Sequence, residues 1–384
     1  MQVKQIYNIV NDITKEIVGD TAVVNEDLSN IVDIGTAIFG ATNVDNYVRT
    51  LVDHIGKVIF VDRVYSGSVP SVLRDGWEYG SVLEKIQAEI PVARENESWE
   101  LTDGQSYDPN VFYKPSVSAK FFNSKVTFEV DMSFTERQVK ESFSNAQQLN
   151  GFISMLYNAV DKSMTIKIDS LVKRTINNFT AETLYDAFSG KDITAGSTAR
   201  AVNLLYLYNQ QFGTTLTKDK ALTTPEFLRF ASYVMATYAD YLKEPSEVFN
   251  IGGKLRFTAK DVLNVVMLSQ FANASKMYLQ SDTYWKELVA LPNADTVAFW
   301  QGSGTDYEFS SVSKIDVKTA QGHTVQADGI LAVMFDRDAL GVCNQDRRVT
   351  TNYNPKGEFF NNFYKFDCSY FNDEDENFVV FYVG

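Results

Sequence analysis

The sequence predicts an α+β fold, and three observations lead to that prediction. A strand-like alternation over residues 126–134 is followed by a long helical pattern that begins near residue 144. Shorter helical and strand patterns are mixed over 186–320, and strand patterns dominate from 329 to the end. Runs of like elements, without a regular strand–helix alternation, are typical of the α+β class. No repeat of about 20–50 residues is visible, which argues against a solenoid or a propeller.

The first 57 residues are expected to form an extension followed by two amphipathic helices. Asn25 or Asp27 can cap the first helix, and Thr42 or Asn43 can cap the second. Gly56 is the residue type that commonly ends a helix. Apolar residues recur at helical spacing in the second helix: Val44, Val48, Leu51, Val52 and Ile55.

Residues 58–116 have no clear periodicity after an apolar run at Val58-Ile59-Phe60-Val61, which predicts a strand. A stretch of this length is too long for a passive connection within a compact domain. It is either disordered or packed against another chain. The stretch contains Trp77 and Trp99 and few runs of charge, which favours packing against another chain over disorder.

The clearest strand pattern leads into the clearest helical pattern. Apolar and polar residues alternate strictly over 126–134, and Thr135 and Gln138 then have the spacing of a capping box. A second such spacing, Ser144 to Gln147, introduces an apolar stripe from Leu149 to Ile176. The stripe predicts a helix about 40 Å long, at 1.5 Å per residue, which would cross a whole domain.

The remaining elements are shorter. Helices are expected at 197–211, at 224–242 with Pro225 in its first turn, and from about Gln270. Apolar runs predict buried strands at 265–268, 330–335 and 378–383, and an alternating pattern predicts a strand at 364–370.

Composition sets limits on function. The chain has 384 residues, of which 45% are hydrophobic and 22% charged, the balance of an ordinary globular protein with room for two or three domains. A net charge of −14 argues against a general nucleic-acid binder, which needs a basic face. Cys343 and Cys368 carry no pairing signature, so free thiols in a reducing cytoplasm are expected. No signal peptide or membrane-spanning apolar run is apparent.

The sequence offers little catalytic chemistry. His54 and His323 are too few and too isolated for a histidine-based metal site or a catalytic triad, and we expect a helix surface for the first and a turn for the second. The glycines near Lys254 lack the pattern of a phosphate-binding loop. Asp373-Glu374-Asp375-Glu376 lacks the spacing of a calcium loop, so a solvated turn between two strands is expected there. We therefore assign no catalytic residue, cofactor or metal.

Three stretches carry a resemblance to a known family. They are Gly329–Val342, with an aromatic-Asp-Arg step at the end of a strand, Arg347–Tyr364 and Asn46–Gly56. The chain resembles the major capsid proteins of tailed bacteriophages, which have the HK-97-type fold shared with encapsulins, and is most similar to those of short-tailed phages of Gram-positive hosts. The resemblance implies an N-terminal arm (1–57), an extended loop (58–131), a peripheral domain with a long spine helix (132–185 and 321–375) and an axial domain (186–320 and 376–384).

The resemblance also implies a function. A structural subunit of this family would close into pentamers and hexamers of an icosahedral shell around double-stranded DNA, which it encloses without sequence-specific binding. Its partners would be copies of itself, a separate scaffolding protein and a portal protein, with no membrane. It would be assembled in the bacterial cytoplasm and end in the virion. A covalent cross-link between loop and peripheral domain is not expected, because no Lys–Asn pair can be assigned.

Candidate contacts between subunits follow from residue chemistry within this scheme. Buried aromatic residues anchor interfaces, and arginine binds carboxylates bidentately. The candidates are Trp77, Trp99, Asp336, Arg337, Asp338, Arg347, Arg348 and Lys356. The charged ones can equally pair within one subunit or face solvent. Two other functions stay open: an encapsulin-type compartment that loads protein cargo, and a cytoplasmic enzyme with an unrecognised carboxylate site.

Overall fold

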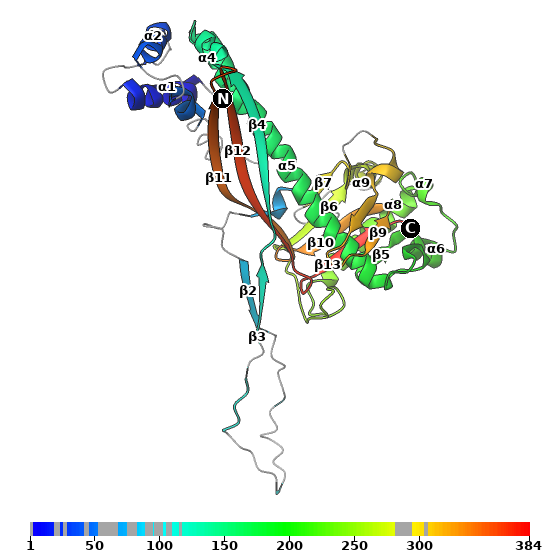
Figure 1. Cartoon of the computed structure of the whole chain (residues 1–384). Helices are drawn as coiled ribbons and strands as arrows, with labels where there is room; N and C mark the ends of the chain where they lie inside the picture. Colours follow the sequence, from blue (N-terminus) through cyan, green and yellow to red (C-terminus); the bar gives the residue numbers. More distant parts are fainter. Residues whose placement is uncertain are drawn as a thin grey trace.

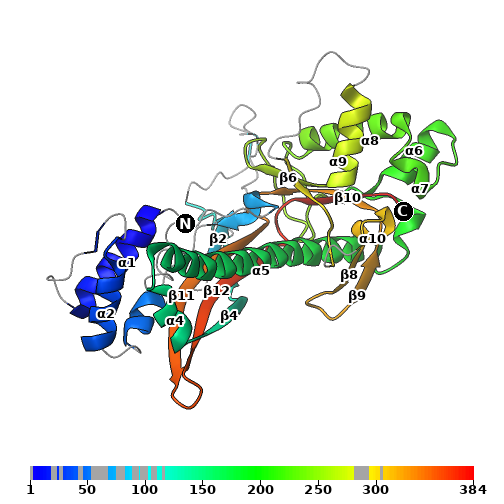
Figure 2. The same cartoon turned by 90° about the horizontal axis from the view of Figure 1, so that it is seen from above.

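The computed structural model describes most of the chain. The described residues are 3–18, 24–25, 29–41, 46–52, 68–74, 83–88, 95, 103–104, 110–114, 117–280, 294–302 and 306–384. Figure 1 shows three parts: a four-stranded sheet, a five-stranded sheet with helices around it, and a hairpin that projects from between them. One long helix, α5 (Ala146–Phe188), runs alongside the first sheet and on to the second (Figure 2).

The four-stranded sheet has the strand order β1-β11-β12-β4. Its strands are β1 (Leu73–Arg74), β11 (Leu340–Asn354), β12 (Phe359–Asn372) and β4 (Lys125–Thr135). The predicted alternation holds in β4, whose residues are alternately exposed and partly buried. Because β4 pairs with β12 from Lys125 onward, the last residues of the predicted extended loop belong to this sheet.

The five-stranded sheet has the order β5-β13-β10-β6-β7. Its strands are β5 (Ala201–Asn203), β13 (Phe378–Tyr382), β10 (Ile330–Asp336), β6 (Leu263–Leu268) and β7 (Ala294–Val297). The three central strands are almost wholly buried, as their apolar runs predict. The predicted division placed 321–336 with the peripheral domain. In the structure β10, which ends at Asp336, lies between β13 and β6 in the five-stranded sheet. The chain crosses to the four-stranded sheet only after Asp336, where β11 follows.

Short helices and one further hairpin complete this part. The α-helices are α6 (Leu204–Phe212), α7 (Lys218–Ala221), α8 (Pro225–Tyr241), α9 (Ser269–Gln280) and α10 (Phe309–Val312). Short 3-10 helices among the described residues are Pro70–Val72 and Ile193–Ala195. A small hairpin is formed by β8 (Ile315–Lys318) and β9 (Thr324–Ala327). Helix α8 begins at Pro225 as predicted. The predicted helix at 197–211 was wrong in its first half, because 201–203 pair with β13 before α6 starts.

The long helix exceeds its prediction. It has 43 residues, about 65 Å at 1.5 Å per residue, because it continues to Phe188, beyond the end of the predicted stripe at Ile176. Beyond Thr175 the helix is buried on several sides, and the single apolar stripe that sequence can reveal is lost. Buried threonines there bond to the helix's own carbonyls, as Thr180 Oγ1 does to Ile176 O at 2.9 Å.

Of the two predicted capping boxes, one is confirmed. Thr135 and Gln138 form the predicted capping box at the start of α4 (Glu136–Ser142). The second predicted box, at Ser144, was wrong by one position: Asn145 caps α5 and accepts from Gln148 N at 2.8 Å. Asparagine satisfies the first helical N–H groups as well as serine does.

The N-terminal region contains more helix than expected. The predicted extension is largely helix α1 (Val3–Val18), and α2 (Ile31–Ala41) and a helical segment at 46–52 follow it. Figure 1 places α1 and α2 beside α4, at the end of the molecule away from the C-terminus. The Tyr47 and Phe143 rings meet edge-to-face at 5.3 Å between centroids, joining the third helical segment to the turn before α5.

The two cysteines form no disulfide with each other, as predicted, and both are buried. Strand register explains why they do not pair: Cys343 lies opposite Ser369, and Cys368 lies opposite Asn344. The two thiols therefore point to opposite faces of the sheet.

Candidate functional site

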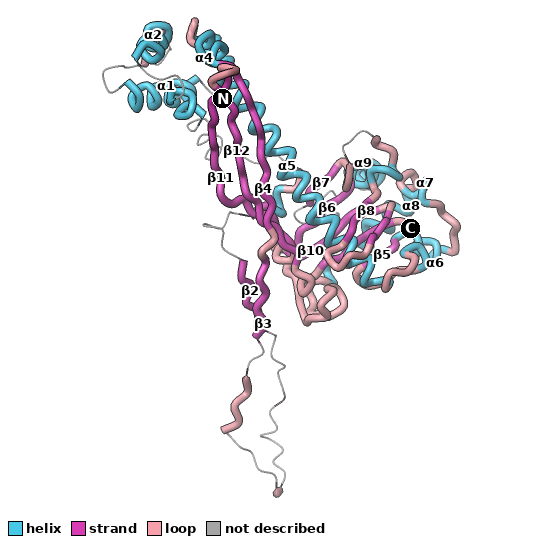
Figure 3. The backbone as a smooth tube through the Cα atoms, viewed as in Figure 1, coloured by secondary structure: helices cyan, strands magenta, loops and turns pink. Residues whose placement is uncertain are grey.

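The base of the projecting hairpin carries two lysines. The hairpin consists of β2 (Leu83–Ala88) and β3 (Val117–Phe122), which pair with each other and with no other described strand. Figure 3 shows it pointing away from both sheets. Its register places Lys85 directly opposite Lys120. Two like charges at paired positions repel, so this lysine pair needs compensating charge from elsewhere.

That compensation comes from residues 373–376, the acidic turn between β12 and β13. The turn is held by backbone bonds, from Asp373 N to Ala339 O at 2.7 Å and from Gly252 N to Glu374 O at 2.9 Å. Gly252 is needed here, because a Cβ at this position would overlap the carboxylate of Asp375. The prediction of a solvated turn was wrong: Asp373 is 0% exposed, and Asp375 and Glu376 are each 8% exposed.

Asp373 binds both lysines at once. Its Oδ2 lies 2.6 Å from Lys85 Nζ, and its Oδ1 lies 2.8 Å from Lys120 Nζ. Lys85 also reaches Glu376 at 2.8 Å, and Lys120 reaches Asp375 at 2.6 Å. A buried carboxylate stays ionised only when it is paired and hydrogen-bonded, as here.

The pKa shifts at this cluster agree with its geometry. Burial alone would raise the pKa of Asp373, but the hydrogen bonds from Lys120 and Lys85 hold that pKa below its ordinary value. Burial would lower the pKa of Lys120, and its bonds to Asp373 and Asp375 raise that pKa instead. Both shifts favour the charged forms, so the cluster is an ion-pair network at neutral pH.

A second set of contacts joins the hairpin to the four-stranded sheet. Lys85 Nζ donates to the backbone oxygen of Asp338 at 3.3 Å, and the Asp338 carboxylate lies 3.1 Å from Arg74. The rings of Phe122 and Phe371 are 5.2 Å apart between centroids. The site therefore gathers β1, the hairpin, β12 and the acidic turn at one junction.

One carboxyl group beside this junction has an unusual pKa. Glu182 lies on α5, where burial, and secondarily the charge of Glu374, raises its pKa to about 7. The backbone N–H of Ala320 donates to it and opposes the shift. Nearby, the Tyr185 ring stacks on the His323 ring, with 4.1 Å between centroids. His323 lies in the turn between β8 and β9, and a turn was predicted for it.

The structure describes some of the predicted contact residues and not others. Trp77, Trp99 and the side chain of Arg347 lie outside the described residues, as does His54. Asp336 is buried and accepts within the subunit from Thr258 Oγ1 and from the backbone N–H of Asp338, both at 2.8 Å.

The other predicted contact residues lie nearer the surface. Arg348 pairs with Asp367 across β11 and β12 at 2.9 Å. Arg337 and Lys356 are exposed, in the turns after β10 and after β11 respectively. Lys85 and Lys120 were missed, since nothing in the local sequence reveals that they lie opposite each other or near residue 373.

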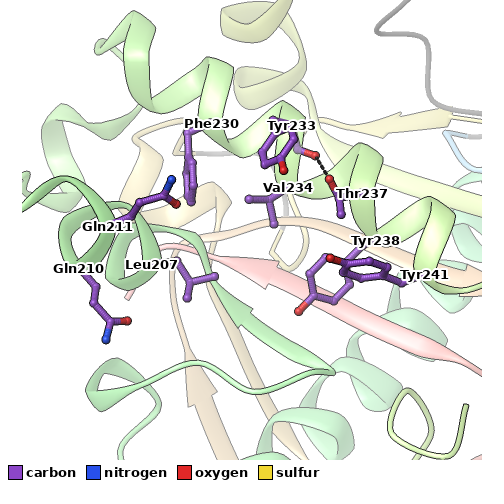
Figure 4. Close-up of a pocket in the computed structure, with 9 residues that line it drawn as sticks. All are labelled: Leu207, Gln210, Gln211, Phe230, Tyr233, Val234, Thr237, Tyr238 and Tyr241. Carbon is purple, nitrogen blue, oxygen red and sulfur yellow. Dashed lines mark hydrogen bonds between the residues drawn. The ribbon is translucent and has the colours of Figure 1, made fainter.

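Apolar side chains are exposed in the loop between β2 and β3 and line a groove in the helical part. Val111, Phe112 and Tyr113, here called the apolar triplet, are 48%, 84% and 77% exposed between β2 and β3. A groove of 340 Å³ lies between α6 and α8 (Figure 4). Its nine lining residues include no carboxylate, lysine, arginine, histidine or cysteine, so it lacks the groups that most often carry acid–base or nucleophilic catalysis. They are Leu207, Gln210, Gln211, Phe230, Tyr233, Val234, Thr237, Tyr238 and Tyr241.

The described residues contain neither a metal site nor a membrane-spanning helix. No group of three or more histidine, cysteine or carboxylate side chains in that part of the chain is arranged to hold a metal ion. No helix among those residues combines the length and apolar character needed to cross a bilayer.

Comparison with known proteins gives a consistent result. The family described as Phi29-like phage major capsid protein matches residues 9–382. The major capsid protein of Bacillus phage GA-1 is 22% identical over 197 residues, an alignment that covers 48% of this chain and only 38% of that relative.

Solved structures agree at the level of the fold. The capsid structure of Staphylococcus phage Andhra has a chain that matches with a TM-score of 0.53 and 9% identity, covering 84% of this chain and 86% of that one. A structure described as the head fiber and inner core protein gp22 of native bacteriophage P68 matches with a TM-score of 0.51, 9% identity and the same coverage.

Proposed function

The chain belongs to the Phi29-like phage major capsid protein family, and on this premise we propose that it forms the icosahedral shell of a tailed-phage head. The observation that carries the proposal is the family match over 9–382, together with an HK-97-type capsid fold. The resemblance read from the sequence is thereby confirmed. The proposed role is structural, and the subunit catalyses nothing.

The parts of the subunit suit assembly into pentamers and hexamers. We assign α1, α2 and the helical segment at 46–52 to the N-terminal arm, and the hairpin to the base of the extended loop. The four-stranded sheet with α5 is the peripheral domain, and the five-stranded sheet is the axial domain. Copies related by rotation about a closed axis make heterologous contacts that form rings. Many modest contacts per subunit then add through multivalency.

The extended loop is the element that reaches a neighbour. Its hairpin points away from both sheets, and its apolar triplet is exposed to solvent in the isolated chain. Three consecutive exposed apolar residues are unfavourable unless they are covered. We place a neighbouring subunit over the apolar triplet, and keep Trp77 and Trp99 as further anchors in the same loop. Arg337, Arg347 and Lys356 remain candidates for charged contacts with neighbours.

The partners follow from this role. A separate scaffolding protein and a portal protein would take part in assembly in the host cytoplasm, and the product would be the virion. Double-stranded DNA would be held by enclosure. A net charge of −14 suits a wall along which DNA slides without being gripped.

Electron microscopy of the purified protein tests the proposal. The protein is expressed alone and with a candidate scaffolding protein from the same phage. Closed icosahedral particles are the expected result, and nuclease-protected DNA inside particles from infected cells separates a phage head from a compartment that loads protein. A uniform monomer or dimer under all assembly conditions would refute the shell.

A further inference from the structure

The hairpin lacks the support that usually fixes a pair of strands. An isolated two-stranded hairpin is only marginally stable in water. This one has no third described strand, and its lysine pair adds a repulsion at directly opposed positions. Its direction therefore depends on contacts with the body of the subunit, and the charges that neutralise Lys85 and Lys120 are the strongest of these.

Asp373 is placed to do this from the body of the subunit. It is fully buried and its two oxygens bind one lysine each. The acidic turn that carries it connects β12 of one sheet to β13 of the other. A single carboxylate thus ties both strands of the hairpin to the point where the two sheets meet.

The other charges at the junction leave Asp373 as the shared partner. Of the two lysines, Asp375 contacts Lys120 and Glu376 contacts Lys85. Glu376 also lies 3.8 Å from Arg256 Nε. Charge-assisted hydrogen bonds in a partly buried site are strong and little weakened by salt. Loss of Asp373's charge would leave two opposed lysines with one acid each and no bridge.

We infer that Asp373 and the lysine pair form a hinge lock, which holds the hairpin at the base of the extended loop in one direction and releases it when the bridge opens. The inference rests on the proposed function, because in a shell the direction of the loop decides whether it reaches the neighbouring subunit. The lock acts within one subunit, before any neighbour binds. The hairpin is therefore aimed in advance, and a change in its direction requires this ion-pair network to break.

Amide hydrogen exchange on the unassembled full-length chain tests the lock without requiring shells. In Asp373→Asn, amides of β2 and β3 should exchange faster by on the order of tenfold, the effect of losing one or two charge-assisted hydrogen bonds. Amides in the centre of β12 should not change. Asp367→Asn is the matched control: it removes a carboxylate of β12 that pairs with Arg348, away from the hairpin, and should leave β2 and β3 unchanged.

A second variant keeps the test decisive if Asp373→Asn fails to fold. Lys120→Met removes one arm of the bridge from a partly exposed position, and should raise exchange in the hairpin by a smaller factor. Unchanged exchange of β2 and β3 in a folded variant would overturn the lock, whether or not shells form. Absence of shells from the wild-type protein, with the exchange effect present, would overturn the proposed function and leave the lock standing.

Discussion

Glu182 should make the stability of the subunit depend on pH near neutrality. Its carboxyl group is partly buried on α5 and faces Glu374 of the acidic turn, the backbone N–H of Ala320 and the turn that holds His323. Burial, with the charge of Glu374 as a smaller cause, raises its pKa from 4.5 to about 7. The perturbation is Glu182→Gln, which has nearly the same shape and still accepts from Ala320.

The direction and size of the effect follow from the pKa. A carboxyl group whose pKa is raised on folding stabilises fully below the unfolded pKa of 4.5, and that stability is lost as pH rises through about 7. The shift corresponds to at most about 3 kcal/mol of free energy of unfolding. Solvent screening of this partly exposed side chain reduces the expected value to about 1–2 kcal/mol.

Thermal or urea unfolding at pH 5 and pH 8 measures the effect. Glu182→Gln should be more stable than wild type at pH 8 by about 1–2 kcal/mol, and the gain should shrink at pH 5, where Glu182 is protonated in the wild type. Glu247→Gln, a change at an exposed acid in the loop after α8, is the matched control and should alter the free energy of unfolding by less than about 0.5 kcal/mol. An equal gain at both pH values, or none at pH 8, would refute the reasoning.

Three further outcomes are expected. Gly329→Ala should lower the free energy of unfolding by at least about 2 kcal/mol, because φ is +82° and a Cβ would overlap the carbonyl oxygen of Val383. Urea unfolding measures this change, and an unchanged free energy of unfolding would contradict it. Trp300→Phe removes the buried hydrogen bond from Trp300 Nε1 to Ile330 O, 2.9 Å long, and should lower the free energy of unfolding by about 1–3 kcal/mol in the same assay. A decrease of less than about 0.5 kcal/mol would count against a stabilising role for that bond. Phe112→Ser should leave the stability of the isolated subunit unchanged and reduce the yield of closed particles in electron microscopy; full yield would remove the apolar triplet from the interface.

Local pattern predicted the elements that are half-buried or capped. The alternation in β4, the capping box at Thr135 and the start of α8 at Pro225 all depend on near neighbours in the chain. The last part of α5, from 177 to 188, was missed because it is buried on several sides, so its apolar residues form no single stripe. The short strand β5 was read as helix, because its structure is decided by pairing with β13 at the other end of the chain.

The junction could not be predicted for the same reason. Its key contact joins Lys85, Lys120 and Asp373, residues that come together only through strand register and the path of β12. A run of four acids reads locally as a solvated turn, and only the fold reveals that it is buried against two lysines. Of the predicted charged contacts, Asp338 lies at the junction, whereas Asp336 and Arg348 are engaged elsewhere within the subunit.

A cryo-electron microscopy map of particles assembled from this chain tests the central claim most directly. The account predicts an icosahedral shell in which α5 and both sheets fit the density of each subunit. It also predicts that the extended loop leaves at the hairpin and lies across a neighbouring subunit with Phe112 covered. Particles without icosahedral order, or a shell in which every loop folds back on its own subunit, would contradict it.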